Sequence, residues 1–433
     1  MSVAKKAVRW SVTHAIPRVA LRRAAGEGDL QARLFTESAE TPTRGLTGLF
    51  DEVHGRGPVV RGKYSYLVSR HSVVRDVLTS QDVRAGIDRV DGVLGRLSTW
   101  SASNHLHPVE APSMLATEPP EHTRYRKLVT RVFTARAVEN LRRRTEEIAA
   151  ELLDALEARA QADDEVDLVE TYCSLLPVTV IAEILGVPDH ERHKVLTLGT
   201  AAAPSLDMGM SWRQFRDTDR ALDEFDAWLG DHLAALKADP GDNLLSKLVE
   251  AREDGVGLDD KELRATAGLV LAAGFETTVN LLGNGIALLR EHPEQLDKVR
   301  QDPSLWPGAV DEILRFDPPV LLTGRTTVRD TEIAGTRVRA GALVTTLLAG
   351  ANRDPEVFDD PHTFDVTRPN AREHIAFSSG RHYCLGAALA RMEGEVGLRA
   401  LFDRFPGLRL LPGAEHRPTR ILRGYETLPA RLT

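Results

Sequence analysis

The chain has 433 residues, of which 55 are basic and 63 acidic, and its net charge is −8. This length can bury a large core, and the acidic balance argues against general nucleic-acid binding. The two cysteines are 211 positions apart, which fits neither a disulfide framework nor a zinc site and favours a reducing cytoplasm.

The sequence shows no boundary at which the chain would divide. No Pro/Gly/Ser-rich linker, repeat or low-complexity tract interrupts it, so residues 1–433 are expected to form one domain. The longest apolar candidate for a membrane span, Ala265–Phe275, is shorter than the ~18–20 residues that a bilayer requires. We therefore expect no membrane span.

The segment Lys5–Arg23 combines basic and apolar side chains, and Pro17 interrupts it. It lacks the apolar core and the cleavage site of a secretory signal. One interpretation is a basic amphipathic helix on a membrane surface. We favour the other, a terminal helix within residues 1–30 that is poorly ordered or packs locally.

Helical periodicity dominates the rest of the chain, and several helices end at glycine or proline. The predicted helices are Ala137–Ala158, Leu168–Leu185, Trp212–Leu236, Leu263–Arg290, Pro293–Arg300, Pro307–Arg315 and Ala387–Phe402. Strand patterns are fewer. Lys63–Ser69 alternates, and Thr331–Leu347 indicates a hairpin-like pair with turns at Gly335 and Gly341. The fold is therefore expected to be mainly α, with small β-sheets.

The predicted helix Leu263–Arg290 contains the run Ala273-Gly274-Phe275-Glu276-Thr277-Thr278, in which glycine and two threonines are weak helix formers. Thr277 can bond to the carbonyl of Ala273, four residues earlier on the same face. A small residue above a hydroxyl leaves room for a diatomic ligand, and Glu276 can pass protons inward. By itself the pattern also fits an ordinary kinked helix with Glu276 on the surface.

Glu312 and Arg315 are three positions apart and share one face of the predicted helix Pro307–Arg315. By itself this spacing indicates a solvated ion pair, which would contribute ~0–1 kcal/mol.

Cys384 stands in a glycine-flanked loop directly before the helical run Ala387–Leu401. The loop reads Phe377-Ser378-Ser379-Gly380-Arg381-His382-Tyr383-Cys384-Leu385-Gly386. The N–H dipoles of a helix N-terminus favour a thiolate, nearby basic residues add positive charge, and a thiolate is a good ligand for haem iron. A free cysteine is more often a small buried hydrophobe, and this is our expectation for Cys173 in the apolar run Tyr172–Leu185.

The Cys384 loop resembles the haem-thiolate signature of the cytochrome P-450 monooxygenases, Phe-Gly-X-Gly-X-His/Arg-X-Cys-X-Gly. The residues at the matching positions are Phe377, Gly380, His382, Cys384 and Gly386. Ser378 replaces the first glycine of the signature, and serine tolerates a positive φ less readily than glycine. Further motifs of the family recur in its order from about residue 118 to the C-terminus.

The resemblance implies a fold and a cofactor. The fold is a helical prism with small sheets that encloses one haem b (iron protoporphyrin IX), with Cys384 as the axial ligand of the iron. The run at Ala273 and Gly274 resembles the oxygen-binding segment, where both residues border the haem. In that family the acid and the threonine of this segment, here Glu276 and Thr277, deliver protons to dioxygen.

The resemblance also assigns a structural network. Glu312 and Arg315 resemble the Glu-X-X-Arg of the helix that underlies the cysteine loop, with Arg368 as the third member. A buried acid between two guanidiniums would be fully bonded, and the loss of one partner would leave a buried charge unpaired. We therefore expect variants that lack Glu312 or Arg315 to be mostly free of haem.

Four cations match the positions that bind the haem propionates. They are His122 and Arg126, which share one face of a helix that starts at Pro119-Pro120, together with Arg325 and His382. A basic stretch near them is either a solvated helix face or a docking patch for an acidic ferredoxin. Its members are Arg124, Lys127, Arg131, Arg136 and Arg142 to Arg144.

The resemblance implies a soluble, cytoplasmic bacterial monooxygenase, and the residue usage is typical of actinobacteria. It would insert one oxygen atom from O2 into a lipophilic small organic substrate. Electrons would come from NAD(P)H through a ferredoxin and a ferredoxin reductase, because the chain has no flavin or iron–sulfur domain. The expected substrate contacts are Arg84–Leu115, Ala201–Met210, Val320–Leu322 and Ile421-Leu422.

Two alternatives stay open. One is a haem-thiolate peroxygenase driven by peroxide, although such relatives typically lack the acid–threonine pair. The other is a non-catalytic haem-binding or ligand-binding protein, which coupled substrate turnover would exclude.

Overall fold

The computed structural model describes residues 2–86, 92–103, 105–132, 135–253 and 255–432, and most of them are helical. The helices are α1 (Val3–Trp10), α2 (Ile16–Gly26), α3 (Leu30–Glu37), α4 (Thr47–Gly55), α5 (His71–Thr79), α6 (Gly92–Trp100), α7 (Glu121–Val132), α8 (Ala135–Ala162), α9 (Leu175–Ile184), α10 (Arg192–Ala202), α11 (Trp212–Ala238), α12 (Leu244–Glu250), α13 (Asp260–Glu291), α14 (Pro293–Gln301), α15 (Trp306–Phe316), α16 (Leu348–Ala351) and α17 (Ala387–Arg404). The strands are β1 (Val60–Arg61), β2 (Tyr66–Val68), β3 (Val83–Ala85), β4 (Val166–Asp167), β5 (Thr323–Thr327), β6 (Thr331–Ile333), β7 (Thr336–Val338), β8 (Leu343–Thr346), β9 (Arg409–Leu410), β10 (Glu415–His416), β11 (Tyr425–Thr427) and β12 (Pro429–Arg431). The expectation of a mainly helical fold with small sheets is confirmed.

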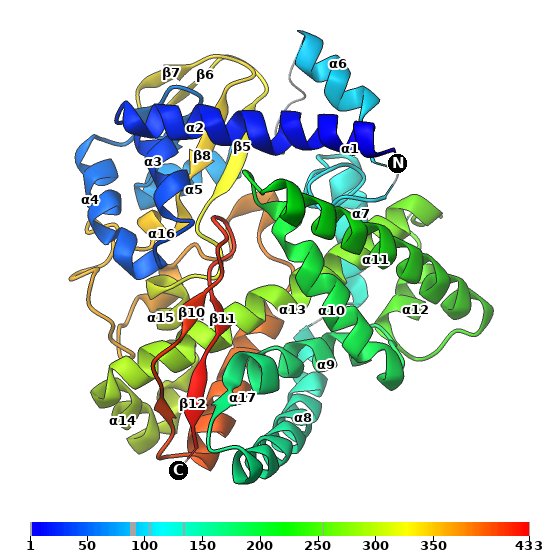
Figure 1. Ribbon diagram of the computed structural model, residues 1–433, viewed down its shortest axis with the longest axis vertical. Helices are drawn as coiled ribbons and strands as arrows, with labels where there is room; N and C mark the ends of the chain where they lie inside the picture. The colour runs from blue at the N-terminus through cyan, green and yellow to red at the C-terminus, as the bar shows by residue number, and fades with distance from the viewer. Residues whose placement is uncertain (1, 87–91, 104, 133–134, 254, 433) are drawn as a thin grey trace.

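The helix α13 crosses the centre of the molecule (Figure 1) and packs against α9, α11, α15 and α17. Asp259 and Glu262 cap its N-terminus reciprocally, which satisfies N–H groups that have no partner within the helix. By length and composition α13 could cross a membrane, but 61% of its apolar window is buried inside the protein. It is therefore the core helix of this fold, and the prediction over Leu263–Arg290 placed it correctly.

The small sheets correct one sequence prediction. The largest sheet has the strand order β1-β2-β8-β5-β3, in which only β2 and β8 are parallel. Within Thr331–Leu347 the hairpin is β6–β7 alone, turning through Ala334 (φ 43°) and Gly335 (φ 78°). β8 instead leaves the hairpin, because its backbone pairs with β2 and β5 in the larger sheet.

The predicted helix Leu168–Leu185 is two elements. A π-helical turn at Val169–Cys173 precedes α9, and the short strand β4 lies before it. Cys173 is fully buried, and burial raises the pKa of its thiol, so it is the core residue that the sequence predicts.

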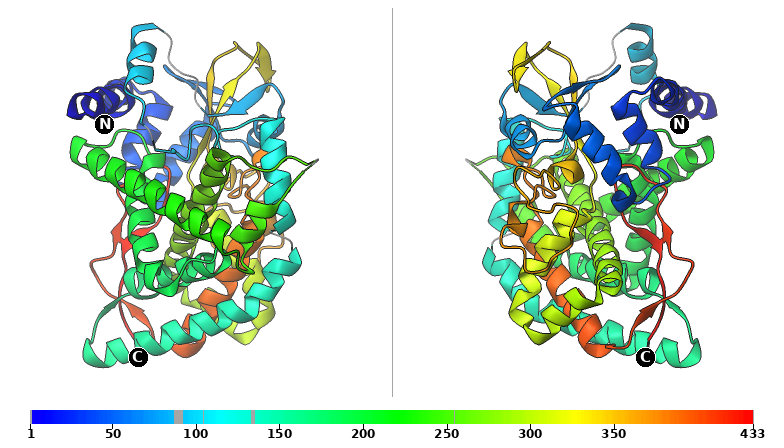
Figure 2. Two further views of the ribbon diagram at one scale, coloured as in Figure 1. Left: turned by 90° about the vertical axis from the view of Figure 1, so that its right-hand side faces the viewer. Right: turned by 90° about the vertical axis from the view of Figure 1, so that its left-hand side faces the viewer.

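The N-terminal segment forms one continuous helix through α1, a π-helical turn at Ser11–Ala15, and α2. The helix continues through Pro17, which follows the π-helical turn after one residue. The segment packs on α11: the Nζ of Lys6 lies 2.6 Å from Asp219, and the indole N–H of Trp10 donates to the Met210 carbonyl at 3.0 Å. In both views of Figure 2 this helix lies at the outer edge of the molecule.

A buried ion network joins α15 to the segment before the Cys384 loop. Arg315 donates to Glu312 through Nε at 2.7 Å and Nη2 at 2.8 Å, and both side chains are 0% exposed. Arg368 donates to the same carboxylate at 3.3 Å. Arg315 also donates to the carbonyls of Asn352, Pro361 and Thr363. The three predicted members thus meet, and α15 is tied to three turns of irregular chain.

The substitution Glu312→Ala is expected to lower the free energy of unfolding by about 3–5 kcal/mol, because it leaves two guanidiniums without their carboxylate in the interior. Urea unfolding followed by circular dichroism measures this change. Glu294→Ala is the matched control: Glu294 forms a partly exposed pair with His292 and should give no measurable change. Equal stabilities of the two variants would contradict the assignment.

Candidate functional site

The Cys384 loop closes on itself. The N–H of Cys384 donates to the Phe377 carbonyl at 2.9 Å, and a 3-10 turn at Gly380–His382 lies between them. Gly386 is the N-cap of α17, so the thiol lies two residues before a helix N-terminus, where the sequence places it.

The ionisation of this thiol differs from the sequence expectation. Although the Cys384 side chain is accessible, the surrounding protein desolvates it, and this burial raises the pKa of the thiol. A hydrogen bond from Gly386 and the charges of Arg126 and Arg391 act in the opposite direction but are weaker. The helix terminus alone therefore does not produce a thiolate at neutral pH. A coordinated metal ion would supply the missing positive charge.

Two residues of the loop have left-handed backbone conformations. Ser378 has φ 63° and Gly380 has φ 69°. A Cβ on Gly380 would lie 2.6 Å from the carbonyl oxygen of Leu78, so glycine is needed there for both its conformation and its size. Ser378 occupies the position where the signature has glycine, and its buried hydroxyl has no hydrogen-bond partner among the residues that the structure describes. The replacement noted in the sequence is thus a strained residue.

On α13 the two threonines bond back to the helix. The Thr277 hydroxyl donates to the Ala273 carbonyl at 3.0 Å, as predicted, and Thr278 donates to Gly274 at 3.3 Å. Ala273 and Thr277 occupy an accessible face of the helix, whereas Thr278 is buried. The helix continues without interruption through this segment.

Glu276 is 2% exposed and not a surface residue. Its carboxylate forms an ion pair with Arg417, which follows strand β10. Burial raises the pKa of Glu276, and the charge and hydrogen bond of Arg417 act to lower it. One helical turn further along α13, the amide of the fully buried Asn280 has no partner in the described part of the chain. Glu276 is therefore a buried acid, paired with Arg417 and one helical turn from a second buried polar side chain.

The four predicted propionate ligands come together around the loop. The imidazole rings of His122 and His382 lie 4.4 Å apart. Burial and the charges of His382 and Arg126 lower the pKa of His122 to about 4, so it is neutral at pH 7. The guanidinium of Arg325 is buried, its Nη1 bonds to Thr323 and Gly324, and burial lowers its pKa to about 10, which leaves it charged.

The site also contains an acid that sequence reasoning missed. Glu118 accepts from Arg381 at 2.8 Å and from the Ala85 N–H at 2.6 Å, and it lies 3.1 Å from Nε2 of His382. A second missed acid, Asp311, binds Arg391 at 2.6 Å, and the Arg391 guanidinium lies over the ring of Phe377. Glu118 directly precedes Pro119-Pro120, and Asp311 directly precedes Glu312. This position next to a recognised motif is the one feature of the sequence that could have indicated their role. Arg417 has no such signal.

These residues fit a haem with two propionates. Nε2 of His122 is buried without a partner, and Arg325 has no carboxylate within ion-pair distance among the described residues. Buried donors of this kind require an acceptor. The accessible sulfur of Cys384 lies close enough for its charge to act on Arg126. The donor set thus offers one soft axial ligand and a group of cations, which is what the cofactor needs.

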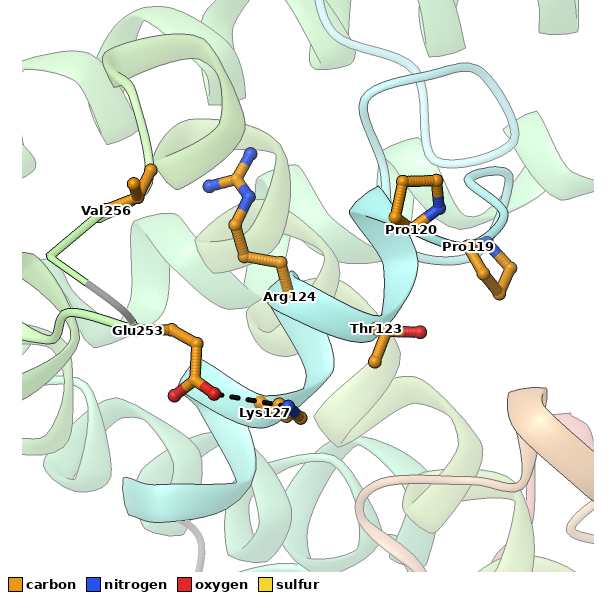
Figure 3. A pocket seen from close by; sticks show the side chains of 7 residues that line it. All are labelled: Pro119, Pro120, Thr123, Arg124, Lys127, Glu253 and Val256. Carbon is orange, nitrogen blue, oxygen red and sulfur yellow. Dashed lines mark hydrogen bonds and ion pairs between the residues drawn. The ribbon is translucent and has the colours of Figure 1, made fainter.

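The basic stretch near these cations is largely neutralised. Arg124 pairs with Glu262 at 2.6 Å, and Lys127 and Arg131 both pair with Glu253. Arg142 pairs with Glu395 and Arg144 with Glu183, while the side chain of Arg136 lies outside the described residues. Figure 3 shows Arg124 and Lys127 beside an open pocket that Pro119, Pro120, Thr123, Glu253 and Val256 complete. Because its cations are paired with acids, this basic stretch should attract an acidic ferredoxin less strongly than its number of arginines and lysines suggests.

The segments expected to contact a substrate partly converge. The N–H of Leu321 donates to the Ile421 carbonyl at 2.9 Å, and Val320 bridges to Leu422. Met208 and Ile421 both pack against the apolar cluster that contains Leu321 and Leu322. Within Arg84–Leu115, residues 87–91 and 104 lie outside the described part of the chain.

Substitutions at the two left-handed residues of the Cys384 loop should have opposite effects on the stability of the protein. Ser378→Gly removes a left-handed serine and an unbonded buried hydroxyl, and should stabilise the protein by about 1 kcal/mol. Gly380→Ala introduces both strain and a contact with backbone, and should destabilise it by about 2 kcal/mol or more. Urea unfolding measures both.

Gly48→Ala is the control for this pair, because a Cβ there meets no atom within 4 Å. A destabilised Ser378→Gly variant would show that the serine side chain has a role that its contacts do not reveal.

Comparison with known proteins identifies the family. Residues 89–420 match the cytochrome P450 family. Cytochrome P450 140 of Mycobacterium tuberculosis is 50% identical over 433 residues, which cover 99% of this chain and 98% of that protein. The 6-deoxyerythronolide B hydroxylase of Saccharopolyspora erythraea is 42% identical over 326 residues, 74% of this chain and 78% of that protein.

A solved structure supports the same assignment. The crystal structure of P450BioI, in complex with an acyl carrier protein that bears hexadec-9Z-enoic acid, superposes with a TM-score of 0.81. The match has 29% sequence identity and covers 90% of this chain and 98% of that chain. The chain therefore belongs to the cytochrome P450 family, whose cofactor is haem, and it is a P450 monooxygenase similar to those of bacteria.

Proposed function

We propose that this P450 inserts one oxygen atom from O2 into a lipophilic small organic substrate in the cytoplasm, with electrons from NAD(P)H through a ferredoxin and its reductase. The observation that carries the proposal is the accessible thiol of Cys384 beside two buried groups, His122, whose Nε2 has no partner among the described residues, and Arg325, which pairs with no carboxylate there.

The residues that would hold the haem follow from the site. Cys384 would bind the iron, and His122, Arg126, Arg325 and His382 would bind the propionates. Ala273, Gly274, Phe377, Gly380 and Gly386 would border the macrocycle. When bound, the haem supplies the iron and the electron-rich thiolate bond that make O–O cleavage possible.

Thr277 and Glu276 would manage protons. The hydroxyl hydrogen of Thr277 is committed to the Ala273 carbonyl, which leaves its oxygen lone pairs free to accept a hydrogen bond on the accessible face of α13. Glu276 has a raised pKa and therefore keeps a proton at a higher pH than an exposed glutamate. The pair combines an oriented acceptor with a proton source one residue away.

The apolar residues around Leu321 and Leu322 favour a lipophilic substrate. Two ligand types deserve the first trial because of the relatives named above. They are 6-deoxyerythronolide B and free or carrier-bound hexadec-9Z-enoic acid.

Reconstitution with a ferredoxin, its reductase and NADPH tests the function, after carbon monoxide binding to the reduced protein has established thiolate ligation. Thr277→Ala should bind haem normally, yet form about tenfold less product per NADPH and release the difference as hydrogen peroxide. Thr278→Ala, whose hydroxyl is buried, is the matched control. Product formed as efficiently from peroxide as from NADPH would favour a peroxygenase, and no turnover would favour a binding protein.

Arg417 offers a test of the proton source. Because the charge of Arg417 lowers the pKa of Glu276, Arg417→Gln should raise that pKa further and extend efficient coupling to higher pH. Infrared spectroscopy should show the protonated carboxyl band at a pH where the parent has lost it. Arg417→Lys keeps the charge and should keep the parent profile. An unchanged profile in the Gln variant would contradict the link.

A further inference from the structure

Glu118 joins three parts of the protein that surround the cation group. It precedes Pro119-Pro120 and the helix α7, which carries His122. Its carboxylate accepts from the Ala85 N–H at the end of β3, at 2.6 Å. It also accepts from Arg381 of the cysteine loop at 2.8 Å. One side chain thus connects a sheet edge, a helix start and the loop of Cys384.

Arg381 extends the same connection. Its Nη2 donates to the carbonyls of Ser80 and Val83, while its Nη1 binds Glu118. Gly380, directly before it, approaches the Leu78 backbone so closely that no Cβ fits. The cysteine loop is therefore fastened to residues 78–85 by contact and by charge, and Glu118 is the acid in this arrangement.

The charge of Glu118 acts beyond its direct partners. It is the carboxylate that attracts the charge of Arg325 and favours protonation of His122. Burial acts to raise the pKa of Glu118, but hydrogen bonds from His382 and the Ala85 N–H, together with the charges of His382 and Arg381, lower it to about 2. Glu118 is thus ionised across the neutral range.

Glu118 contributes a negative charge to the cationic group around the cofactor position. Arg126, Arg325 and Arg381 are permanent cations of the group, and His122 is neutral at pH 7. Haem brings two propionates, which are fewer than these three guanidiniums, and His382 adds a further donor beside Glu118, so the group needs another counter-ion. Glu118 supplies it. An unpaired charge in a desolvated site is costly, and like charges without a counter-ion separate.

We propose that Glu118 is a positioning residue for the haem: the resident counter-ion that gathers Arg325, Arg381 and His382 and fastens the cysteine loop, so that the remaining cations are placed for the propionates. The inference rests on the proposed function, because it requires that haem bind at Cys384. The proposal predicts that the Glu118 carboxylate strengthens haem retention, even though this carboxylate and the propionates are both negatively charged.

The experiment uses the purified holoenzyme and measures haem loss to excess apomyoglobin by the change in Soret absorbance. Glu118→Gln keeps the shape and removes the charge. It should lose haem about ten- to a hundredfold faster than the parent, because the negative charge opposite Arg381 and His382 disappears and one accepting oxygen becomes an NH2 group that cannot accept. Glu118→Asp keeps the charge and should fall between the two. Circular dichroism at the same temperature confirms that the variants remain folded.

Glu121→Gln is the matched control, since Glu121 is an exposed acid in the first turn of α7. It should retain haem like the parent. Haem loss from Glu118→Gln at the parent rate would overturn the proposal, and slower loss would show that Glu118 repels the propionates instead. If Glu118→Gln does not accumulate as folded protein, the test uses Glu118→Asp instead. Its rate of haem loss is then compared with that of Glu121→Gln, and equal rates would overturn the proposal.

The failure of this inference is distinct from that of the proposed function. A parent protein that binds no haem refutes both. A parent that binds haem, with a Gln variant that retains it equally well, refutes the role of Glu118 alone.

Discussion

The buried ion pair between Glu312 and Arg315 fixes the base on which the cysteine loop rests. Arg315 donates to the carbonyl of Asn352, and the side-chain oxygen of Asn352 accepts the N–H of Ile375 at 2.8 Å, two residues before Phe377. Neither ion has access to water, so every charge must find its partner within the protein. That requirement leaves the chain between α16 and α17 little freedom, and the position of Cys384 follows from it.

The same constraint recurs around the sulfur and on α13. Glu118 compensates Arg381, Asp311 compensates Arg391, and Arg417 compensates Glu276. In each pair at least one member comes from a distant part of the chain. Because charges interact strongly away from water, such pairs hold their segments together and also set which groups keep a proton.

Two polar side chains near the central helix are buried without a charged partner within the described chain. Glu393 on α17 is fully buried, and this burial raises its pKa well above the usual range although a hydrogen bond with Thr278 acts to lower it, so the neutral acid avoids the cost of a buried charge. Asn280 on α13 cannot ionise, and its side-chain amide has no hydrogen-bond partner among the described residues. It lies against Gly424, so close that a Cβ on Gly424 would clash with the amide oxygen of Asn280. The backbone of the C-terminal hairpin thus approaches α13 closely on the side that carries Glu276.

The sequence by itself determined the helices with strong periodicity, such as α11 and α13, and the short motifs that carry chemistry. Local rules suffice there, because helix capping, the Thr277–Ala273 hydrogen bond and the Cys384 loop all depend on residues close in sequence. Only the tertiary structure decided that Glu312 is buried, that β8 leaves its hairpin, that Cys384 resists ionisation, and that Arg417 and Glu118 find their partners. Burial and the pairing of distant charges depend on how the whole chain packs, and no local pattern records either one.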